Sequence, residues 1–204
     1  MSSEARQVIL DSIRAHLAAS PSYDVEPQIF ADERESDPPA SVNIGGLFKQ
    51  NLESVAGHCI ITTDATDVLR QIITDLGVQR IAVSDAPELA EFGVVPGANE
   101  IFSFDVGITT AQAAIAETGT VVLDSSCERN RLVSVVPPVH IAIVAASRIC
   151  ATLADALAIL QSGKELSPAI TFITGPSRTA DIELTLTIGV HGPQELYVII
   201  DESS

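Results

Sequence analysis

The stretch HCIITTDATDVLRQIITDLGVQRIAVS, residues 58–84, decides the fold class of this chain. It opens with a short apolar run, His58 to Ile61, which predicts a buried strand. Apolar residues then recur every three or four positions, which predicts a helix from Asp64 to Leu76 that Gly77 ends. Residues 80–84 predict a second strand. The order strand, helix, strand is typical of a parallel sheet, because parallel neighbours need a crossover connection.

The same alternation of strand-like and helix-like segments continues to the C-terminus. Residues 181–188 alternate strictly, which favours a strand, but they follow a Gly-Pro turn, and we favour a short helix there. We expect further helices at residues 4–19, 45–55, 88–92, 110–117 and 151–160, and further strands at residues 101–104, 120–123, 139–144, 169–173 and 195–200. The sequence therefore predicts an α/β fold, with a mainly parallel sheet, helices on both faces and an N-terminal helical extension.

The chain has 204 residues, a length that suits one α/β domain with an ordered extension. We expect residues 1–43 to form an N-terminal helix and an acidic connector with several prolines, and residues 44–204 to form the α/β domain. Only 4% of the residues are aromatic. The core must therefore be built from Val, Ile, Leu and Ala, as buried parallel strands usually are.

Charge and composition exclude several classes of partner. Eleven basic residues stand against 27 acidic ones, which gives a net charge of −16. This opposes binding to nucleic acid or to anionic membranes, because both need clustered Lys and Arg. No apolar run suits a signal peptide or a membrane span, so we expect a cytoplasmic protein with no membrane insertion. Cys59, Cys127 and Cys150 are far apart in the sequence and predict reduced thiols that fill the core.

The first candidate binding segment is residues 105–120. Gly107 allows a tight turn, and Thr109 or Thr110 can cap the predicted helix that follows. Free amides at a helix N-terminus, with hydroxyls beside them, suit a carboxylate or a phosphate. Thr118 and Gly119 then turn the chain back into a strand. This segment is a candidate anion site, although ordinary turn chemistry explains the same residues.

The second and third candidate segments are residues 174–183 and 189–193. A Gly-Pro turn precedes two hydroxyls and a guanidinium, and Arg pairs bidentately with carboxylate or phosphate. The alternative is that Arg178 only braces its loop by pairing with Asp181 or Glu183. The candidate ligand-binding residues in these segments are Gly175, Ser177, Arg178, Thr179, Asp181 and Gly192.

Two residues are candidates for catalysis. Glu117 can be a nucleophile or a base, or a structural acceptor for backbone amides. His191, beside Gly192, can be a base, a donor or a metal ligand, or a structural loop residue. No metal-ligand spacing, P-loop or dinucleotide motif occurs, so no cofactor or metal is expected. Because ligands of open α/β sheets bind at the carboxyl ends of the strands, we expect the three segments to meet in one pocket.

The same segments resemble the LUD-domain family, in its lactate-utilisation protein C type. The resemblance lies in Gly107–Thr109 with Ala116–Thr120, in Pro137–Ile141, and above all in TGPSRTADIE at residues 174–183 followed by GVHGP at residues 189–193. It covers residues 4–201. It implies a fold similar to the NagB/RpiA/CoA-transferase-like group, which includes formyltetrahydrofolate cyclo-ligase.

The resemblance also implies a role beside two iron–sulfur partner proteins in converting L-lactate to pyruvate. Family members that carry a cluster have extra cysteine motifs, which this chain lacks. We therefore expect a cluster-free accessory subunit with a small-anion site. The alternatives are a stand-alone enzyme or a sensor for a small carboxylate, phosphate or acyl ester, and the sequence leaves open whether the isolated chain is an enzyme.

Overall fold

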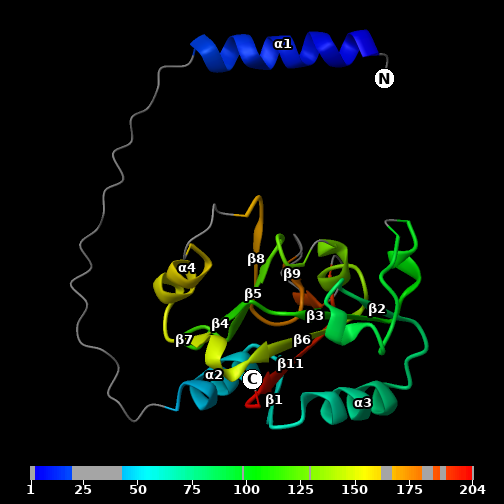
Figure 1. Ribbon diagram of the computed structural model, residues 1–204, viewed down its shortest axis with the longest axis vertical. Helices are drawn as coiled ribbons and strands as arrows, with labels where there is room; N and C mark the ends of the chain where they lie inside the picture. The colour runs from blue at the N-terminus through cyan, green and yellow to red at the C-terminus, as the bar shows by residue number, and fades with distance from the viewer. Residues whose placement is uncertain are drawn as a thin grey trace, which may run out of the picture. The chain divides into compact units, whose positions relative to one another are not determined.

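The computed structural model describes residues 3–19, 43–97, 99–128, 130–161, 167–180, 186–188 and 192–203 (Figure 1). The chain divides into two compact units, Met1–Asp37 and Pro38–Ser204. The first contains α1 (Ser3–Ala19), which confirms the predicted helix, and its Val8, Ile9 and Ile13 side chains are exposed. The predicted connector lies outside the described residues, up to residue 42. No helix among the described residues could cross a bilayer, since none combines the length and the apolar character required.

The larger unit is built on a five-stranded sheet in the order β1-β11-β6-β3-β2, in which every pair of neighbours is parallel (Figure 1). β11 lies between β1 and β6, so the last strand of the chain is an interior strand. The predicted mainly parallel sheet is confirmed. The bounds are β1 His58–Thr62, β2 Ile81–Val83, β3 Val106–Thr110, β6 Val139–Ala145 and β11 Glu195–Asp201.

Helices cover both faces of this sheet, as predicted. Successive residues of β11 separate the two sides, because side chains of a strand alternate between faces. Val198 belongs to a core cluster with Leu52 of α2 (Ile44–Ser54), whereas Ile199 belongs to a cluster with Leu69 of α3 (Ala65–Leu76). All four side chains are fully buried. This explains why the strands read as continuous apolar runs rather than as alternating ones.

The ends of α3 follow from its sequence. The Asp64 carboxylate accepts a hydrogen bond from the Asp67 backbone N–H at 3.0 Å and so caps the first turn. Gly77 ends the helix with φ of 62°, a left-handed conformation that glycine adopts without strain. Both predicted helix ends are therefore confirmed.

A second sheet, in the order β7-β4-β5-β8, adds a layer that the sequence did not predict. Ala114 of β4 joins the core cluster of α2, whereas Ile115 packs with Ala156 of α4, so this sheet is buried between the two helices. A further antiparallel pair joins β9 and β10. The bounds are β4 Ala113–Ile115, β5 Thr120–Asp124, β7 Ile149–Cys150, α4 Leu153–Gln161, β8 Ile170–Ile173, β9 Arg178–Ala180 and β10 Leu186–Ile188.

Three predicted elements are wrong. Residues 110–117 are not helical: they contain the end of β3 and all of β4, because their small side chains are buried from both sides between two layers. Residues 101–104 hold a 3₁₀ helix, η2 (Ile101–Ser103), and the strand comes after it. The helix favoured at 181–188 is wrong at 186–188, which form β10, and residues 181–185 lie outside the described residues. The other 3₁₀ helices are η1 Pro87–Leu89, which shortens the helix predicted at 88–92, η3 Arg131–Ser134 and η4 Ala146–Arg148.

Leu52 offers a direct test of this layered core, because it is 0% exposed whereas Leu47 of the same helix is 36% exposed. We expect Leu52→Ala to lower the free energy of unfolding by about 2–5 kcal/mol through a cavity under the sheet. Leu47→Ala is the matched control and should cost about 1 kcal/mol or less. Urea titration followed by circular dichroism measures both. Equal losses in the two variants would contradict the arrangement.

Candidate functional site

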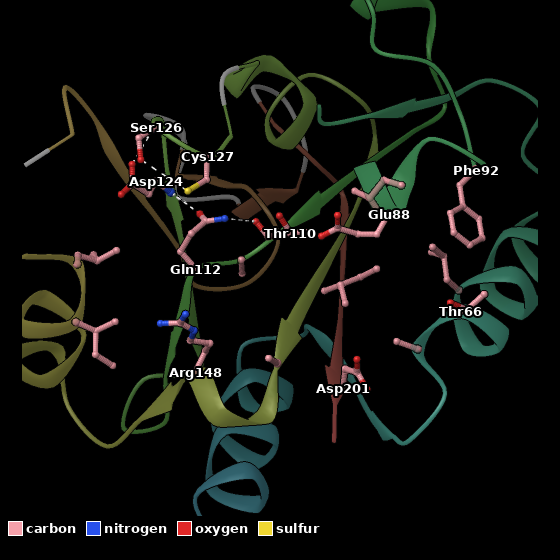
Figure 2. Close-up of a pocket in the computed structure, with 18 of the residues that line it drawn as sticks. Thr66, Glu88, Phe92, Thr110, Gln112, Asp124, Ser126, Cys127, Arg148 and Asp201 are labelled. Carbon is pink, nitrogen blue, oxygen red and sulfur yellow. Dashed lines mark hydrogen bonds between the residues drawn. The ribbon is translucent and has the colours of Figure 1, made fainter. Parts of the chain in front are cut away.

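An open cleft of about 910 Å³ lies at the carboxyl ends of the parallel strands (Figure 2). Thr110 ends β3, Ala145 ends β6 and Asp201 ends β11, and all three line the cleft. Residues of α3, η1 and α4 complete its walls. This is where open α/β sheets bind ligands. The polar and ionisable lining residues are Thr66, Glu88, Thr110, Gln112, Asp124, Ser126, Cys127, Arg148, Ser167 and Asp201.

Gln112 fixes one wall of the cleft by joining two strand ends. Its Nε2 donates to the Thr110 carbonyl oxygen at 3.0 Å, and its Oε1 accepts from the Asp124 backbone N–H at 2.7 Å. Asp124 in turn accepts a hydrogen bond from the Ser126 backbone N–H at 2.7 Å. Figure 2 shows these bonds as one chain of contacts along the wall. The ends of β3 and β5 are therefore held at a fixed spacing.

Behind this wall lies a buried carboxyl group, that of Glu128, which is 2% exposed. Its Oε1 accepts two hydrogen bonds from Thr110, one from the backbone N–H at 3.0 Å and one from the hydroxyl at 2.6 Å. The Ser84 hydroxyl lies near enough to favour the ionised form of Glu128. Neither Glu128 Oε2 nor Ser84 Oγ, however, has a partner at hydrogen-bonding geometry within the described residues.

Burial raises the pKa of Glu128 above its ordinary value. The two hydrogen bonds from Thr110 and the nearby Ser84 hydroxyl lower this pKa, and the nearby negative charge of Asp85 raises it, but desolvation is the largest effect. The protonated, neutral form of Glu128 is therefore more strongly favoured inside the folded protein than it would be in water.

The charges along the cleft are unequal. Arg148 is the single cation among the described lining residues, beside the carboxylates of Glu88, Asp124 and Asp201. No group of three His, Cys, Asp or Glu side chains that could hold a metal ion occurs in the part of the chain that the structure describes. The guanidinium of Arg148 is thus the group in this cleft that suits an anion.

The cysteines divide into two kinds. Cys59 and Cys150 are buried, as predicted, and burial raises the pKa of Cys59 to about 12. Cys127 is exposed and lines the cleft, so its predicted core position is wrong. The reason is local: Cys127 follows the end of β5, where its backbone N–H bonds the Asp124 carbonyl oxygen in a turn at the surface.

Gly107 and Thr109, two predicted ligand-binding residues, lie inside the sheet. A Cβ on Gly107 would come within 1.9 Å of the Val133 carbonyl oxygen, so this glycine allows η3 to approach β3. The Thr109 hydroxyl lies 2.9 Å from Nε2 of His140, and both side chains are buried. Burial lowers the pKa of His140 to about 3, which keeps the imidazole neutral. No helix begins at Thr109.

Glu117 sits at the start of α4, where its Oε1 accepts a hydrogen bond from the Leu153 backbone N–H at 2.9 Å. This is the structural role that the sequence analysis set beside the catalytic one. The Thr118 hydroxyl lies 2.7 Å from that of Thr120. Gly119 has φ of 65°, and a Cβ there would come within 2.3 Å of the Leu52 backbone nitrogen. Gly119 therefore lets α2 contact this turn closely.

The 174–178 loop meets the 118–120 turn and the 192–193 segment beside the end of α2. Thr120 and Thr174 hydroxyls are 2.6 Å apart, and the Ser177 N–H donates to the Pro193 carbonyl at 2.8 Å.

The remaining predicted ligand-binding residues of this corner can also be located. Gly175, with φ of 88°, faces the Val55 carbonyl oxygen, which also accepts a hydrogen bond from the Arg178 guanidinium at 2.6 Å. A Cβ on Gly192 would come within 2.9 Å of Ser177 Cβ. The predicted segments thus converge in part.

None of the predicted site residues is among those that line the cleft. Thr179 lies in β9, described by its backbone, and Asp181 and His191 lie outside the described residues. Gln112, Asp124, Glu128 and Arg148 were not among the residues predicted from the sequence. A signal was available for part of this set: the polar run from Asp124 to Glu128 directly follows a predicted strand, and strand ends are where sites form.

Fold and cleft together define a parallel α/β protein with a candidate site at the carboxyl edge of its sheet. Comparison with known proteins narrows this class. The sequence model of the LUD domain matches residues 96–200. A crystal structure of a DUF162 family protein from Deinococcus radiodurans superposes with a TM-score of 0.59 over 78% of this chain and 96% of that chain. Their 20% identity supports the shared fold alone.

The chain belongs to the LUD domain family. Relatives named lactate utilization protein C include one from Macrococcus caseolyticus, 32% identical over 69% of this chain and 70% of its own length. Another, from Geobacillus sp. strain WCH70, is 32% identical over 76% of this chain and 77% of its own length. The protein from Bacillus subtilis strain 168 is 42% identical over 48% of this chain and 43% of its own length.

Glu117 can be tested for its structural role. We expect Glu117→Ala to lower the free energy of unfolding by about 1 kcal/mol, because the first turn of α4 loses an acceptor. Glu117→Gln keeps a side-chain oxygen and should lose less than half as much. Thermal and urea unfolding measure both variants. If Glu117→Ala is as stable as the unchanged protein, the bond to Leu153 contributes nothing.

Glu128 predicts a particular pH dependence of stability. Its raised pKa means that the folded state binds the proton more tightly than the unfolded state. The resulting stabilisation is present at low pH and is lost as the pH rises from the unfolded pKa through the folded one. Glu128→Gln keeps the shape and an acceptor for Thr110 without this proton. We expect its stability relative to the unchanged protein to increase with pH across that window; a constant difference would contradict the assignment.

Proposed function

We propose that this chain is a cluster-free accessory subunit of a cytoplasmic lactate-utilisation system that oxidises L-lactate to pyruvate. The observation that carries the proposal is the similarity to proteins named lactate utilization protein C, which extends over more than two thirds of the chain. The partners in this proposal are iron–sulfur proteins, which would carry the electrons that lactate oxidation releases.

The cysteines support a role without a cluster. An iron–sulfur cluster commonly needs four thiolate ligands, whereas this chain has three cysteines, of which Cys59 and Cys150 are buried. The net charge of −16 supports a docking role, because complementary charge speeds the encounter of two proteins and fixes their orientation. A basic surface on an iron–sulfur partner is the matching feature.

The proposed small-anion site is assigned to the cleft at the strand ends. The cleft is open and carries the Arg148 guanidinium. The corner around Ser177, Gly192 and Arg178 is the other candidate, and there one guanidinium nitrogen already donates to the Val55 carbonyl oxygen. The cleft is favoured because its cation is not engaged in this way.

A second candidate function is a stand-alone enzyme or a sensor for a small carboxylate, phosphate or acyl ester. The observation that favours it is the buried Glu128 behind the cleft wall, since a carboxyl group with a raised pKa is typical of functional sites. Product analysis after incubation with such compounds separates an enzyme, which changes its ligand, from a sensor, which does not.

The test is genetic. Deleting the gene for this chain from its bacterial host should abolish growth on L-lactate as the carbon source and leave growth on pyruvate unchanged. Restoring the gene should restore growth, and the tagged chain should retain iron–sulfur proteins on an affinity column. Unimpaired growth on L-lactate would overturn the proposal. Oxidation of L-lactate by the purified chain alone would replace the accessory role with the enzymatic one.

A further inference from the structure

We propose that the cleft binds a small 2-hydroxy or 2-oxo carboxylate, with Arg148 holding the carboxylate and the Thr110 hydroxyl, backed by Glu128, bonding the C2 oxygen. This inference rests on the proposed function and deepens it by naming the ligand class and the residues that select it. Three features of the cleft carry the argument: a cation with no hydrogen-bond or ion-pair partner among the described residues, a hydroxyl that lines the cleft, and behind that hydroxyl a buried acid with one oxygen that no described residue bonds.

Arg148 is placed to bind the carboxylate. It ends η4, just beyond the carboxyl end of β6, and its side chain lines the cleft below Gln112 in Figure 2. Within the described residues the guanidinium makes no hydrogen bond or ion pair. Its fork of donors therefore remains available, and this fork matches the two oxygens of a carboxylate. The carboxylates of Glu88 and Asp201, which line the same cleft, disfavour a second anionic group on the ligand.

Thr110 presents the group that can recognise the C2 oxygen. It is the last residue of β3, it lines the cleft, and its hydroxyl donates to Glu128 Oε1 at 2.6 Å. A hydroxyl that donates a hydrogen bond to a carboxylate keeps its lone pairs, so it can also accept a hydrogen bond from another donor. With Glu128 ionised, Thr110 thus accepts a hydrogen bond from a ligand hydroxyl.

Glu128 extends this recognition to a keto oxygen. Its Oε2 is buried and has no partner at hydrogen-bonding geometry within the described residues. When Glu128 takes up a proton, its oxygens become poorer acceptors and the Thr110 hydroxyl is released to donate into the cleft. A 2-oxo carboxylate, which offers only an acceptor at C2, then fits. The protonation state of Glu128 therefore selects between the hydroxy acid and the keto acid.

The titratable groups near Glu128 and along the cleft beside it come from three segments. Asp85 follows β2 and acts on Glu128 through its charge, Asp124 ends β5 and its carbonyl oxygen accepts a hydrogen bond from the Glu128 backbone N–H at 2.7 Å, and Glu88 of η1 lines the cleft. All three are acidic, and the negative charge of Asp85 favours the protonated form of Glu128. The selection between the two ligands consequently shifts toward the hydroxy acid as the pH rises.

Calorimetry with L-lactate, pyruvate and propionate tests the inference. Propionate has the same carbon chain and carboxylate but no C2 oxygen. We expect propionate to bind about tenfold more weakly than lactate at pH 8, which is the loss of one hydrogen bond to a polar group. Raising the pH from 6 to 8 should favour lactate over pyruvate. Equal affinity for propionate and lactate would overturn the role of Thr110 and Glu128, and absence of binding for all three acids would overturn the whole inference.

Matched variants assign the roles. Arg148→Gln should lower the affinity for all three acids by about tenfold or more, because a charged hydrogen bond is lost. Arg131→Gln, outside the cleft lining, is the control and should leave these affinities unchanged. Thr110→Val should lower the affinity for lactate to that for propionate. Thr110→Ser should restore the difference in affinity between the two acids. Glu128→Gln should abolish the pH dependence of the preference between lactate and pyruvate. Unchanged binding in Arg148→Gln, or a pH-dependent preference that survives in Glu128→Gln, would overturn the assignment.

Circular dichroism on each variant separates a lost contact from a lost fold. The growth test of the proposed function is independent of these measurements. A chain that supports growth on lactate but binds none of the three acids would leave the accessory role intact and overturn only the ligand site.

Discussion

The larger unit depends on β11, the last strand of the chain, being buried between β1 and β6. Every residue of β11 from Glu195 to Asp201 is in register with β6, and its Val198 and Ile199 point into opposite core clusters. Both edges and both faces of this strand are therefore satisfied inside the protein. Its partners lie far away in the sequence, so the core of this unit is built on non-local contacts, which slow folding.

This constraint also determines where chemistry can occur. Parallel strands that share a register end together, and the ends of β3, β6 and β11 bring Thr110, Ala145 and Asp201 to one edge. The backbone there has no further strand to bond, so polar side chains take over, as Gln112 does between β3 and β5. The buried acid Glu128 belongs to the same network. Its burial costs stability, and such a cost is typical of positions that serve binding or proton transfer.

The spacing of apolar residues predicted the helices and strands that have one layer of structure packed on each side. The unit from β1 through α3 to β2 is readable because each apolar stripe matches one period and each end has its own capping or turn residue. The prediction from apolar spacing failed at Ala113–Ile115, because these residues are buried between two layers and their spacing does not distinguish a strand from a helix. For the site, the residues that the sequence predicted do not line the cleft at the strand ends. The glycines at 107 and 119 serve close packing against η3 and α2, a purpose that sequence spacing cannot reveal.

The sequence by itself determined the family, the α/β class, the parallel sheet with helices on both faces and the acidic character of the chain. These follow from local pattern, composition and motif, which are properties of neighbouring residues. The tertiary structure alone decided that Gln112, Asp124 and Arg148 line one cleft with Glu128 buried behind its wall, and that Glu117 accepts a hydrogen bond at the start of α4. Such contacts join segments tens of residues apart, and their energies depend on burial, which exists only once the layers have come together.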